Sequence, residues 1–243
     1  MKDSLTIFFP CYNDSATIAG MVVAADMVAR QLTEDYEILV VDDGSSDHSR
    51  EVLKELSLKY NRLRLVFHDT NMGYGGALKS GFKNATKELI FYTDGDAQYD
   101  VHELKTLWQR MSDDVDVVNG FKMKRHDPWH RVFIGFIYQH LIRMAFALKI
   151  KDVDCDCRLM RSRIFDKVKL QHDSGVICVE MIRKIQEAGF RFTEVGVHHF
   201  FRAVGKSQFF NFKRLARAVK DLAALWVNLI ILTRGVSGGD RFA

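Results

Sequence analysis

The sequence lacks a long apolar run, which excludes the simplest kind of membrane protein. No window reaches the ~18 apolar residues that a membrane-spanning helix requires. The nearest candidate, Leu222–Leu232, is interrupted by Asn228. A secretory signal is not expected either, because Thr6–Phe9 already has the pattern of a core strand. We therefore expect a protein that is soluble or that touches a membrane only at its surface.

Cysteine is scarce, with four residues in a chain of 243. Only Cys155 and Cys157 lie close together, and no second pair accompanies them, so their spacing argues against a zinc site. In the expected absence of a secretory signal, we predict reduced thiols and a cytoplasmic location. Peripheral contact with the inner face of the membrane is compatible with that location.

The net charge is only +4, but the cations are clustered. Phe121–Lys151 contains seven Lys or Arg and one acid, and Val195–Lys220 contains six and no acid. Such stretches favour an anionic partner, namely a phosphate, a nucleic acid or an acidic membrane surface, although a solvated basic face has the same pattern. The hydrophobic fraction of 47% excludes global disorder.

Short apolar runs alternate with helical periods, which predicts an α/β fold with a doubly wound, mostly parallel sheet flanked by helices. The predicted strands are Leu5–Phe9, Tyr36–Val41, Leu63–Phe67, Glu88–Thr93, Val115–Asn119 and Arg191–Val195 with its continuation to Phe201. The predicted helices are Ser15–Leu32, Ser46–Tyr60 (capped by Ser45 or Ser46), Tyr74–Thr86, Val101–Met111, Arg131–Lys149, Val176–Ala188 and Asn211–Leu232. Residues 1–210 then form one domain, 211–235 a C-terminal amphipathic helix, and 236–243 a frayed tail.

Two acids directly follow one predicted strand. Asp94 and Asp96, separated by Gly95, come after Glu88–Thr93, and ligands of such sheets bind beyond the carboxyl ends of the strands. Two carboxylates at this spacing can hold a hard divalent cation, with diphosphate oxygens completing its shell. Asp94 facing a nucleoside and a polar turn with solvated acids are the alternatives.

Polar turns follow two more strands. Asp42-Asp43-Gly44-Ser45-Ser46-Asp47 can accept hydrogen bonds from a base N–H or from ribose hydroxyls, and a turn with a helix cap explains the same residues. Pro10-Cys11-Tyr12-Asn13-Asp14 reads as the entry turn to the next helix.

A glycine-rich segment, Asn71–Gly81, enters a predicted helix. Such a turn can admit a diphosphate near the helix N-terminus, whereas glycines that allow close packing of the helix are the alternative. The segment lacks the third glycine of G-x-G-x-x-G and follows the third strand, so it is not a dinucleotide fingerprint.

Jointly, these segments occur in the order and spacing of family 2 glycosyltransferases, and from about Leu5 to Phe209 the chain most resembles the polyprenyl-phosphate (dolichyl-phosphate) hexose transferases. The resemblance implies a GT-A (nucleotide-diphospho-sugar transferase) fold, a UDP- or GDP-sugar donor, and Mg²⁺ or Mn²⁺ at Asp94 and Asp96. Asp14 stands where that family usually has Glu. The donor-binding residues that the resemblance implies are Pro10, Tyr12, Asn13, Asp14, Asp43, Gly73, Gly76, Lys79, Asp94, Gly95, Gln98 and Ser207.

The resemblance also implies catalytic roles for Asp156, Arg158 and Arg202. Asp156 and Arg158 match an Asp-Phe-Arg pattern beside the acceptor, with Cys157 in place of the aromatic residue. Arg202 begins an Arg-x-x-Gly-x-Ser loop that closes over donor phosphates, with Gln208 where Lys is frequent. A helix cap or a salt bridge to a neighbouring arginine is the alternative role for Asp156.

The implied reaction is a single in-line displacement with inversion at the anomeric carbon. A polyprenyl-phosphate acceptor is already anionic, and Arg125, Arg131 or Arg158 would orient it. A hydroxyl on a soluble glycan or metabolite would instead require Asp156 to take its proton.

The two long helices predicted in the second half also bear on the acceptor. Arg131–Lys149 and Asn211–Leu232 combine apolar surface with cations, which suits contact with anionic lipids, although a core-facing helix has the same pattern. Pairing of two copies of the chain through these helices is a further option.

Two functions of other classes explain less of the sequence. A catalytically silent nucleotide-sugar-binding protein does not need the acids at Asp94, Asp96 and Asp156. A nucleic-acid-binding module would carry a recognised motif, and acid-lined strand ends repel phosphate unless a metal intervenes. We therefore expect an enzyme without a nucleic-acid partner.

Overall fold

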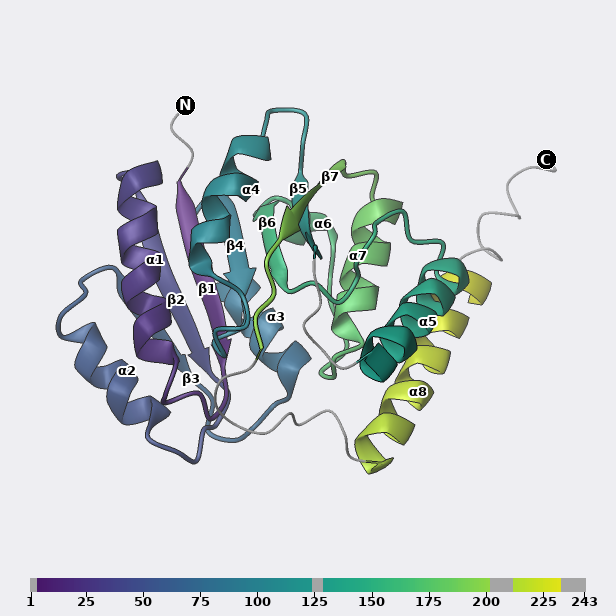
Figure 1. Ribbon diagram of the computed structural model, residues 1–243, viewed down its shortest axis with the longest axis horizontal. Coiled ribbons are helices and arrows are strands. Elements are labelled where there is room, and N and C mark those ends of the chain that lie inside the picture. Colours follow the sequence, from purple (N-terminus) through teal and green to yellow (C-terminus); the bar gives the residue numbers. More distant parts are fainter. Residues whose placement is uncertain (1–3, 124–128, 202–211, 233–243) are drawn as a thin grey trace.

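The computed structural model is built on one seven-stranded sheet (Figure 1) and describes residues 4–123, 129–201 and 212–232. The strand order is β3-β2-β1-β4-β6-β5-β7. Neighbouring strands are parallel except around β6, which is antiparallel to both β4 and β5. The mostly parallel α/β sheet predicted from the sequence is therefore confirmed. The strands are β1 Leu5–Cys11, β2 Tyr36–Asp42, β3 Leu63–Phe67, β4 Leu89–Thr93, β5 Val117–Lys122, β6 Cys157–Arg161 and β7 Phe192–Val197.

Helices cover both faces of the sheet. Helices α1, α2 and α4 contribute to the apolar layer on one face, and α3, α6 and α7 contribute to the layer on the other. The helical segments are α1 Ile18–Leu32, α2 Ser49–Ser57, α3 Tyr74–Asn84, η1 Val101–Glu103, α4 Leu104–Arg110, α5 Trp129–Ala145, α6 Ile164–Lys167, α7 Ile177–Glu187, α8 Phe212–Trp226 and the π-helical turn η2 Val227–Leu232.

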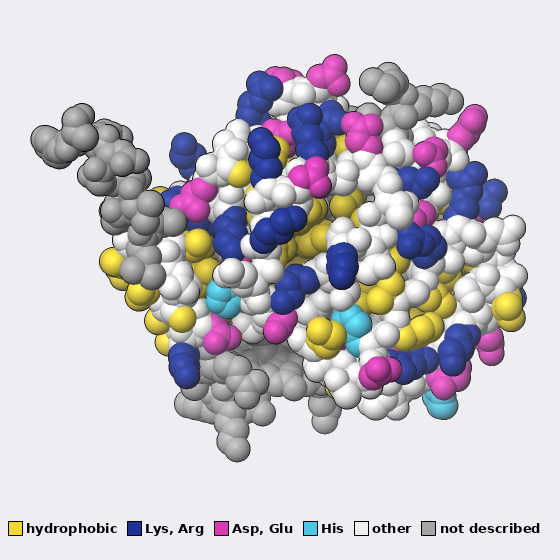
Figure 2. All heavy atoms as spheres, turned by 180° about the vertical axis from the view of Figure 1, so that it is seen from behind, with side chains coloured by type: hydrophobic (Ala, Val, Ile, Leu, Met, Phe, Trp, Pro, Cys, Tyr) yellow, Lys and Arg dark blue, Asp and Glu magenta, His cyan; other side chains and the backbone are white. Residues whose placement is uncertain are grey.

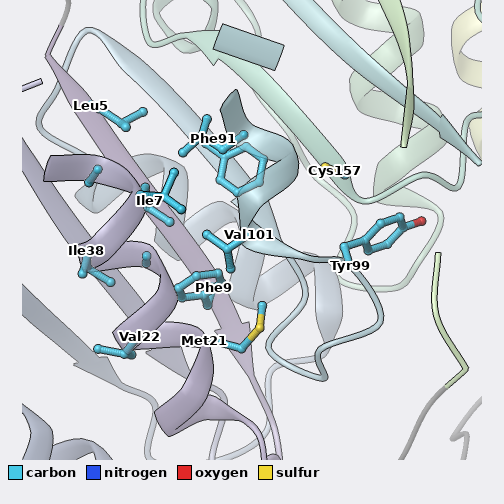
Figure 3. Close-up of a cluster of buried hydrophobic side chains, with 14 of the residues drawn as sticks. Leu5, Ile7, Phe9, Met21, Val22, Ile38, Phe91, Tyr99, Val101 and Cys157 are labelled. Atoms are coloured by element: carbon cyan, nitrogen blue, oxygen red, sulfur yellow. The ribbon is translucent and has the colours of Figure 1, made fainter. Parts of the chain in front are cut away.

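Alternate side chains of one strand enter opposite layers, because successive residues of a strand point to opposite faces. In β1, Ile7 and Phe9 pack with Met21 and Val22 of α1 (Figure 3), whereas Phe8 packs with Phe82 of α3. Every residue of β1, β2 and β4 is buried. This explains why these strands read as continuous apolar runs, which is typical of parallel strands covered on both faces.

A third apolar cluster joins α5, α7 and α8 at one end of the molecule. Ile142 of α5, Ile182 of α7 and Leu225 of α8 are buried within it. The indole N–H of Trp226 donates to the carbonyl of Ala145 at 2.8 Å, which ties α8 to the end of α5. The two helices lie side by side at this end of the sheet (Figure 1).

Strand β6 was not predicted, and it is the main difference from the expected topology. Its sequence, Cys-Arg-Leu-Met-Arg, carries two arginines that interrupt the apolar pattern of a core strand. Arg158 is nevertheless fully buried there, and Arg161 is 6% exposed. Both side chains are accommodated because internal acceptors bind their guanidinium groups.

Several predicted boundaries were wrong by a few residues. Helix α2 begins at Ser49 rather than Ser46, because the carboxylate of Asp47 accepts the Ser49 N–H and holds the preceding residues in a turn. The neighbouring N-cap position belongs to His48, so neither Ser45 nor Ser46 caps this helix. Helix α5 ends at Ala145 rather than Lys149, where Ala147 adopts a φ of 49°. Strand β7 stops at Val197, before the predicted continuation to Phe201.

Within the described ranges, no helix is long and apolar enough to cross a membrane.

The close approach of α3 to β1 generates a stability prediction. A Cβ atom at Gly81 would lie 2.0 Å from the ring of Phe8, whereas a Cβ atom at Gly20 in α1 would meet nothing within 4 Å. We expect Gly81→Ala to lower the free energy of unfolding by roughly 1–3 kcal/mol through overpacking. The matched control Gly20→Ala should raise it by up to ~1 kcal/mol through helix propensity. Urea unfolding followed by circular dichroism measures both changes, and equal effects would contradict this packing argument.

Candidate active site

Acids from three neighbouring strands meet at one edge of the sheet. Strands β2, β1 and β4 are adjacent and parallel, so the residues that follow them, Asp43, Asp14 and Asp94, emerge on the same side. Backbone bonds join these turns, since Asp43 N donates to the Cys11 carbonyl at 2.9 Å and Gly95 N to the Pro10 carbonyl at 3.2 Å. The sequence prediction that Asp43, Asp94 and Asp96 share one edge therefore agrees with the structure.

The reversed strand β6 brings a further acid to this edge. Thr93, the last residue of β4, pairs with Cys157, the first residue of β6. Because the pair is antiparallel, Asp94 after one strand lies beside Asp156 before the other. A parallel neighbour would have placed the start of its strand at the opposite edge of the sheet.

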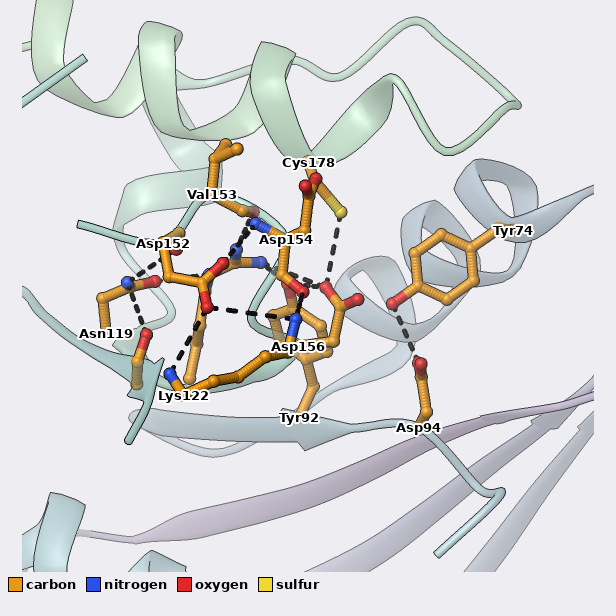
Figure 4. A network of polar contacts seen from close by, with 12 residues as sticks. Tyr74, Tyr92, Asp94, Asn119, Lys122, Asp152, Val153, Asp154, Asp156 and Cys178 are labelled. Carbon is orange, nitrogen blue, oxygen red and sulfur yellow. Dashed lines mark hydrogen bonds and ion pairs between the residues drawn. The ribbon is translucent and has the colours of Figure 1, made fainter. Parts of the chain in front are cut away.

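Asp94 is held by a tyrosine and crowded by other acids. The hydroxyl of Tyr74 in α3 donates to its Oδ1 at 2.9 Å (Figure 4). Burial raises the pKa of Asp94 well above its usual range, and the charges of Asp156 and Asp96 raise it further. A cation at this edge would favour the ionised form, because it would offset the repulsion between these carboxylates.

Asp96 sits in a tight turn beyond Asp94. Its Oδ1 accepts the Gln98 N–H at 3.0 Å, and Ala97 between them adopts a φ of 59°. Gln98 turns toward a distant segment, since its side-chain amide donates to the Phe200 carbonyl at 3.3 Å and its own carbonyl accepts the Phe200 N–H. The turn is thereby linked to the chain just before residue 202.

The predicted donor residues after β1 differ in their surroundings. Tyr12 is 36% exposed, and its backbone N–H donates to Asp14 Oδ2 at 3.1 Å. The side chain of Asn13 accepts the backbone N–H groups of Ser46 and Asp47, so it joins two loops of the site. Pro10 is a buried residue of β1 itself rather than part of a turn. The hydrogen bonds from Ser46 and Asp47 give Asn13 a structural role, which sequence reasoning had not identified.

The two acids after β2 also differ. Asp42 is fully buried and forms an ion pair with Arg50 of α2. Asp43 binds the ring of His68 and the backbone N–H of Met72. The predicted nucleoside-binding residue, Asp43, is therefore anchored by a histidine that sequence reasoning missed.

The glycines of the glycine-rich segment lie close to neighbouring protein atoms. The N–H of Gly75 donates to the Asp173 carbonyl at 2.8 Å. A Cβ atom at Gly73 would lie 2.5 Å from that carbonyl, and one at Gly76 would meet Met72 at 2.7 Å. Lys79 forms an ion pair with Asp173 at 2.5 Å. Close packing, the alternative interpretation of these glycines, explains these contacts.

Asp156 and Arg158 belong to one buried polar network (Figure 4). Asp156 Oδ1 lies 3.3 Å from both Arg158 and the Tyr92 hydroxyl, and 3.4 Å from the Cys178 thiol. The guanidinium of Arg158 also donates to Asn119 Oδ1 at 2.6 Å, to the Tyr92 hydroxyl and to a backbone carbonyl. With Arg158 fully buried, direct contact with an acceptor phosphate, one of its predicted roles, does not fit. Its geometry fits the positioning of Asp156.

A second acid beside Asp156 was not among the predicted site residues. Asp154 is partly exposed, and its backbone carbonyl accepts the Lys122 ammonium at 2.8 Å. Burial raises the pKa of its carboxyl to about 6, Lys122 lowers it, and Asp152 and Asp156 raise it. The alternating acids of residues 152–156 are the sequence signal that could have identified this position.

Four predicted residues, or their side chains, fall outside the part of the chain that the structure describes. Arg125, Arg202 and Ser207 lie outside the described residues, and Arg131 falls in α5 but its side chain is not described.

The amino-acid sequence matches the family model "Glycosyl transferase family 2" over residues 6–169, about two thirds of the chain. That range includes the acids after β1, β2 and β4, the glycine-rich segment and all of β6.

Solved structures show the same fold. Glucosyl-3-phosphoglycerate synthase from Mycobacterium tuberculosis, in complex with Mn²⁺, UDP and glucosyl-3-phosphoglycerate, superposes with a TM-score of 0.70 at 15% identity, covering 93% of this chain and 79% of that one. A mannosyltransferase from Pyrobaculum calidifontis, in complex with GDP-Man and Mn²⁺, has a TM-score of 0.69 at 18% identity, covering 94% of this chain and 65% of that one. The GT-A fold expected from the sequence is thereby confirmed.

The range that the family model matches includes the acids that meet at one edge of the sheet. The chain is therefore a nucleotide-sugar glycosyltransferase that belongs to glycosyl transferase family 2.

Proposed function

We propose that this enzyme moves a hexose from a UDP- or GDP-sugar to an acceptor with inversion at the anomeric carbon, assisted by Mg²⁺ or Mn²⁺. The observation that carries the proposal is the convergence of Asp94, Asp96 and Asp156, whose mutual repulsion helps raise the pKa of Asp94. A divalent cation with a nucleoside diphosphate would relieve that repulsion at the place where the leaving group forms.

The ligands present suit a metal that is shared with the substrate. Among the described residues, no group of three or more His, Cys, Asp or Glu could hold a metal ion. Asp94 and Asp96 offer two carboxylates, and Mg²⁺ is usually bound by one or two carboxylates together with substrate phosphates. Mn²⁺ also accepts such oxygen ligands. We propose that Asp96 is the direct ligand, as the family resemblance implies.

In this reaction the acceptor oxygen forms a bond to the anomeric carbon as the bond to the diphosphate oxygen breaks. When bound, the metal supplies positive charge that stabilises the departing diphosphate. Asp43 binds the nucleoside, and the Tyr74 hydroxyl fixes the orientation of Asp94. Burial raises the pKa of Tyr74, so its hydroxyl remains a hydrogen-bond donor. Arg202 and Ser207 are proposed to contact the diphosphate, as the family resemblance implies.

We further propose that the acceptor is a polyprenyl phosphate at a membrane surface. Exposed apolar side chains support it: Ile137, Leu141 and Met144 recur at helical spacing along α5 and are 43%, 56% and 67% exposed. The neighbouring α8 and η2 add Val219, Val227 and Ile231, each at least 43% exposed.

Cations next to this apolar surface support an anionic bilayer as its partner. The exposed Lys220 lies next to Val219, and the sequence of α8 also contains Lys213, Arg214 and Arg217. An apolar face beside cations fits the interface of an anionic bilayer. At this end of the molecule, exposed hydrophobic side chains form the left edge of Figure 2. Arg125 and Arg131 would then orient the phosphate.

A hydroxyl acceptor is the second candidate, and the acids on the acceptor side favour it. The side chain of Asp156 is 16% exposed, and Asp154 beside it is partly exposed. A hydroxyl needs a base, whereas a phosphate monoester is already ionised near neutral pH. The two candidates therefore make opposite demands on these carboxylates.

The donor and metal assignment predicts the behaviour of Asp96→Asn. The uncharged amide is a poorer ligand for a hard cation, so we expect Mn²⁺-dependent hydrolysis of UDP- and GDP-sugars to fall by about 10²-fold or more. Asp113→Asn, which changes an exposed acid in the segment between α4 and β5, should leave the rate unchanged. Hydrolysis of a panel of nucleotide sugars with and without Mn²⁺ measures both variants. A metal-independent rate, or full activity in Asp96→Asn, would contradict the assignment.

The acceptor assignment predicts the behaviour of Asp156→Asn. With a polyprenyl phosphate in anionic vesicles as acceptor, we expect turnover within about threefold of the unmodified enzyme, because no general base is required. With a hydroxyl acceptor, loss of the base should reduce turnover by about 10²–10⁴-fold. Product formation with both acceptor types, at matched melting temperatures of the two proteins, separates the cases. A large loss with the lipid phosphate would refute the preferred candidate.

A further inference from the structure

A buried chain of hydrogen bonds runs from α3 to Asp43, the acid that follows β2. The hydroxyl of Ser80 lies 2.8 Å from Nε2 of His68, and Nδ1 of His68 lies 2.7 Å from Oδ1 of Asp43. The side chains of His68 and Asp43 are 8% and 4% exposed. In the tautomer that fits both contacts, the ring donates to the carboxylate and accepts from the serine.

The anchors of Asp43 converge on one oxygen. The N–H of Met72 also donates to Oδ1, at 2.8 Å. Among the described residues, none donates a hydrogen bond to Oδ2 of Asp43. One carboxylate oxygen is thus engaged by the protein, and the other keeps its lone pairs for a base N–H or a ribose hydroxyl.

An anchored carboxylate matters here because the last torsion of an aspartate is soft. Its χ2 angle is broadly distributed, so an unsupported carboxylate samples many orientations. A ligand must then order it on binding, and the entropy lost reduces affinity. The contact with His68 orders the carboxylate before the ligand binds, so this entropy is not lost on binding.

The backbone of His68 is itself fixed, which leaves the ring as the variable part. The His68 N–H donates to the Asp42 carbonyl at 2.9 Å, and Arg50 of α2 donates to the His68 carbonyl. Substitution of the ring should therefore leave the course of the chain at this position unchanged.

We propose that His68 is a positioning residue that orients Asp43 for the nucleoside part of the donor, with Ser80 fixing the ring. The inference rests on the proposed function, in which Asp43 binds the nucleoside. It assigns donor affinity to a side chain that does not itself touch the substrate.

Two isosteric amides separate positioning from a general structural role. In His68→Asn the amide nitrogen takes the place of Nδ1 and retains the contact with Asp43, while the contact with Ser80 is lost. In His68→Gln the side-chain amide reaches the place of Nε2, where its oxygen can accept from Ser80, while the contact with Asp43 is lost. If His68 served only packing or stability, nucleotide affinity would not depend on which of the two contacts, with Asp43 or with Ser80, the variant retains.

Calorimetric titration with UDP and GDP, in Mn²⁺, is the experiment. We expect His68→Asn to bind the preferred nucleotide within about threefold of the unmodified protein, and His68→Gln about tenfold more weakly, the loss expected for one hydrogen bond to a charged group. In donor hydrolysis, His68→Gln should raise KM with kcat unchanged. Melting temperatures verify that both variants are folded.

Equal affinities of the two folded variants, or a fall in kcat without a change in KM, would overturn the positioning role. Asp43→Asn is the reference, and unchanged nucleotide affinity in that variant would also overturn it. Failure of the unmodified protein to bind either nucleotide would instead contradict the proposed function.

Discussion

Carboxylates that converge at one edge of a sheet repel one another, and burial strengthens that repulsion. Here Asp94, Asp96 and Asp156 come from two antiparallel neighbours, and burial and their charges raise the pKa of Asp94. The clustered negative charge therefore favours binding of a cation at the position where a sugar diphosphate would be bound. In this account, the metal and the nucleotide are expected to bind cooperatively, since each supplies charge or ligands that the other needs.

The reversal of β6 is the topological feature that makes this concentration of acids achievable. It places Asp156 next to Asp94, and it carries Arg158 into the interior between β4 and β5. Arg158 is fully buried and satisfied by Asn119, Tyr92 and Asp156. A buried cation of this kind contributes little net stability unless it is fully hydrogen-bonded. Its evident consequence is a defined orientation for Asp156.

Much of the architecture was predictable because β1, β2 and β4 are buried on both faces and therefore read as apolar runs. The acids after these strands could be assigned to one edge for the same reason, since parallel strands end together. Strand β6 could not be predicted, because Arg158 and Arg161 break the apolar pattern and their partners are remote in sequence.

The glycine-rich segment also shows that a local sequence pattern does not reveal a partner remote in sequence. Gly73 and Gly75 accommodate the backbone at His172–Asp173, roughly a hundred positions along the chain, and no local pattern distinguishes that neighbour from a bound phosphate. His68 was missed because its task depends on Asp43 and Ser80, which the fold alone brings together. Local patterns thus indicated the elements and the chemistry, whereas long-range pairing decided which side chains act together.

The most direct test of the central claim is the affinity for Mn²⁺ measured by electron paramagnetic resonance with and without UDP or GDP. We predict weak binding of Mn²⁺ alone and binding tightened by about tenfold or more with the nucleoside diphosphate, because the protein supplies only part of the coordination shell. An affinity for Mn²⁺ that is the same with and without the nucleotide would contradict it.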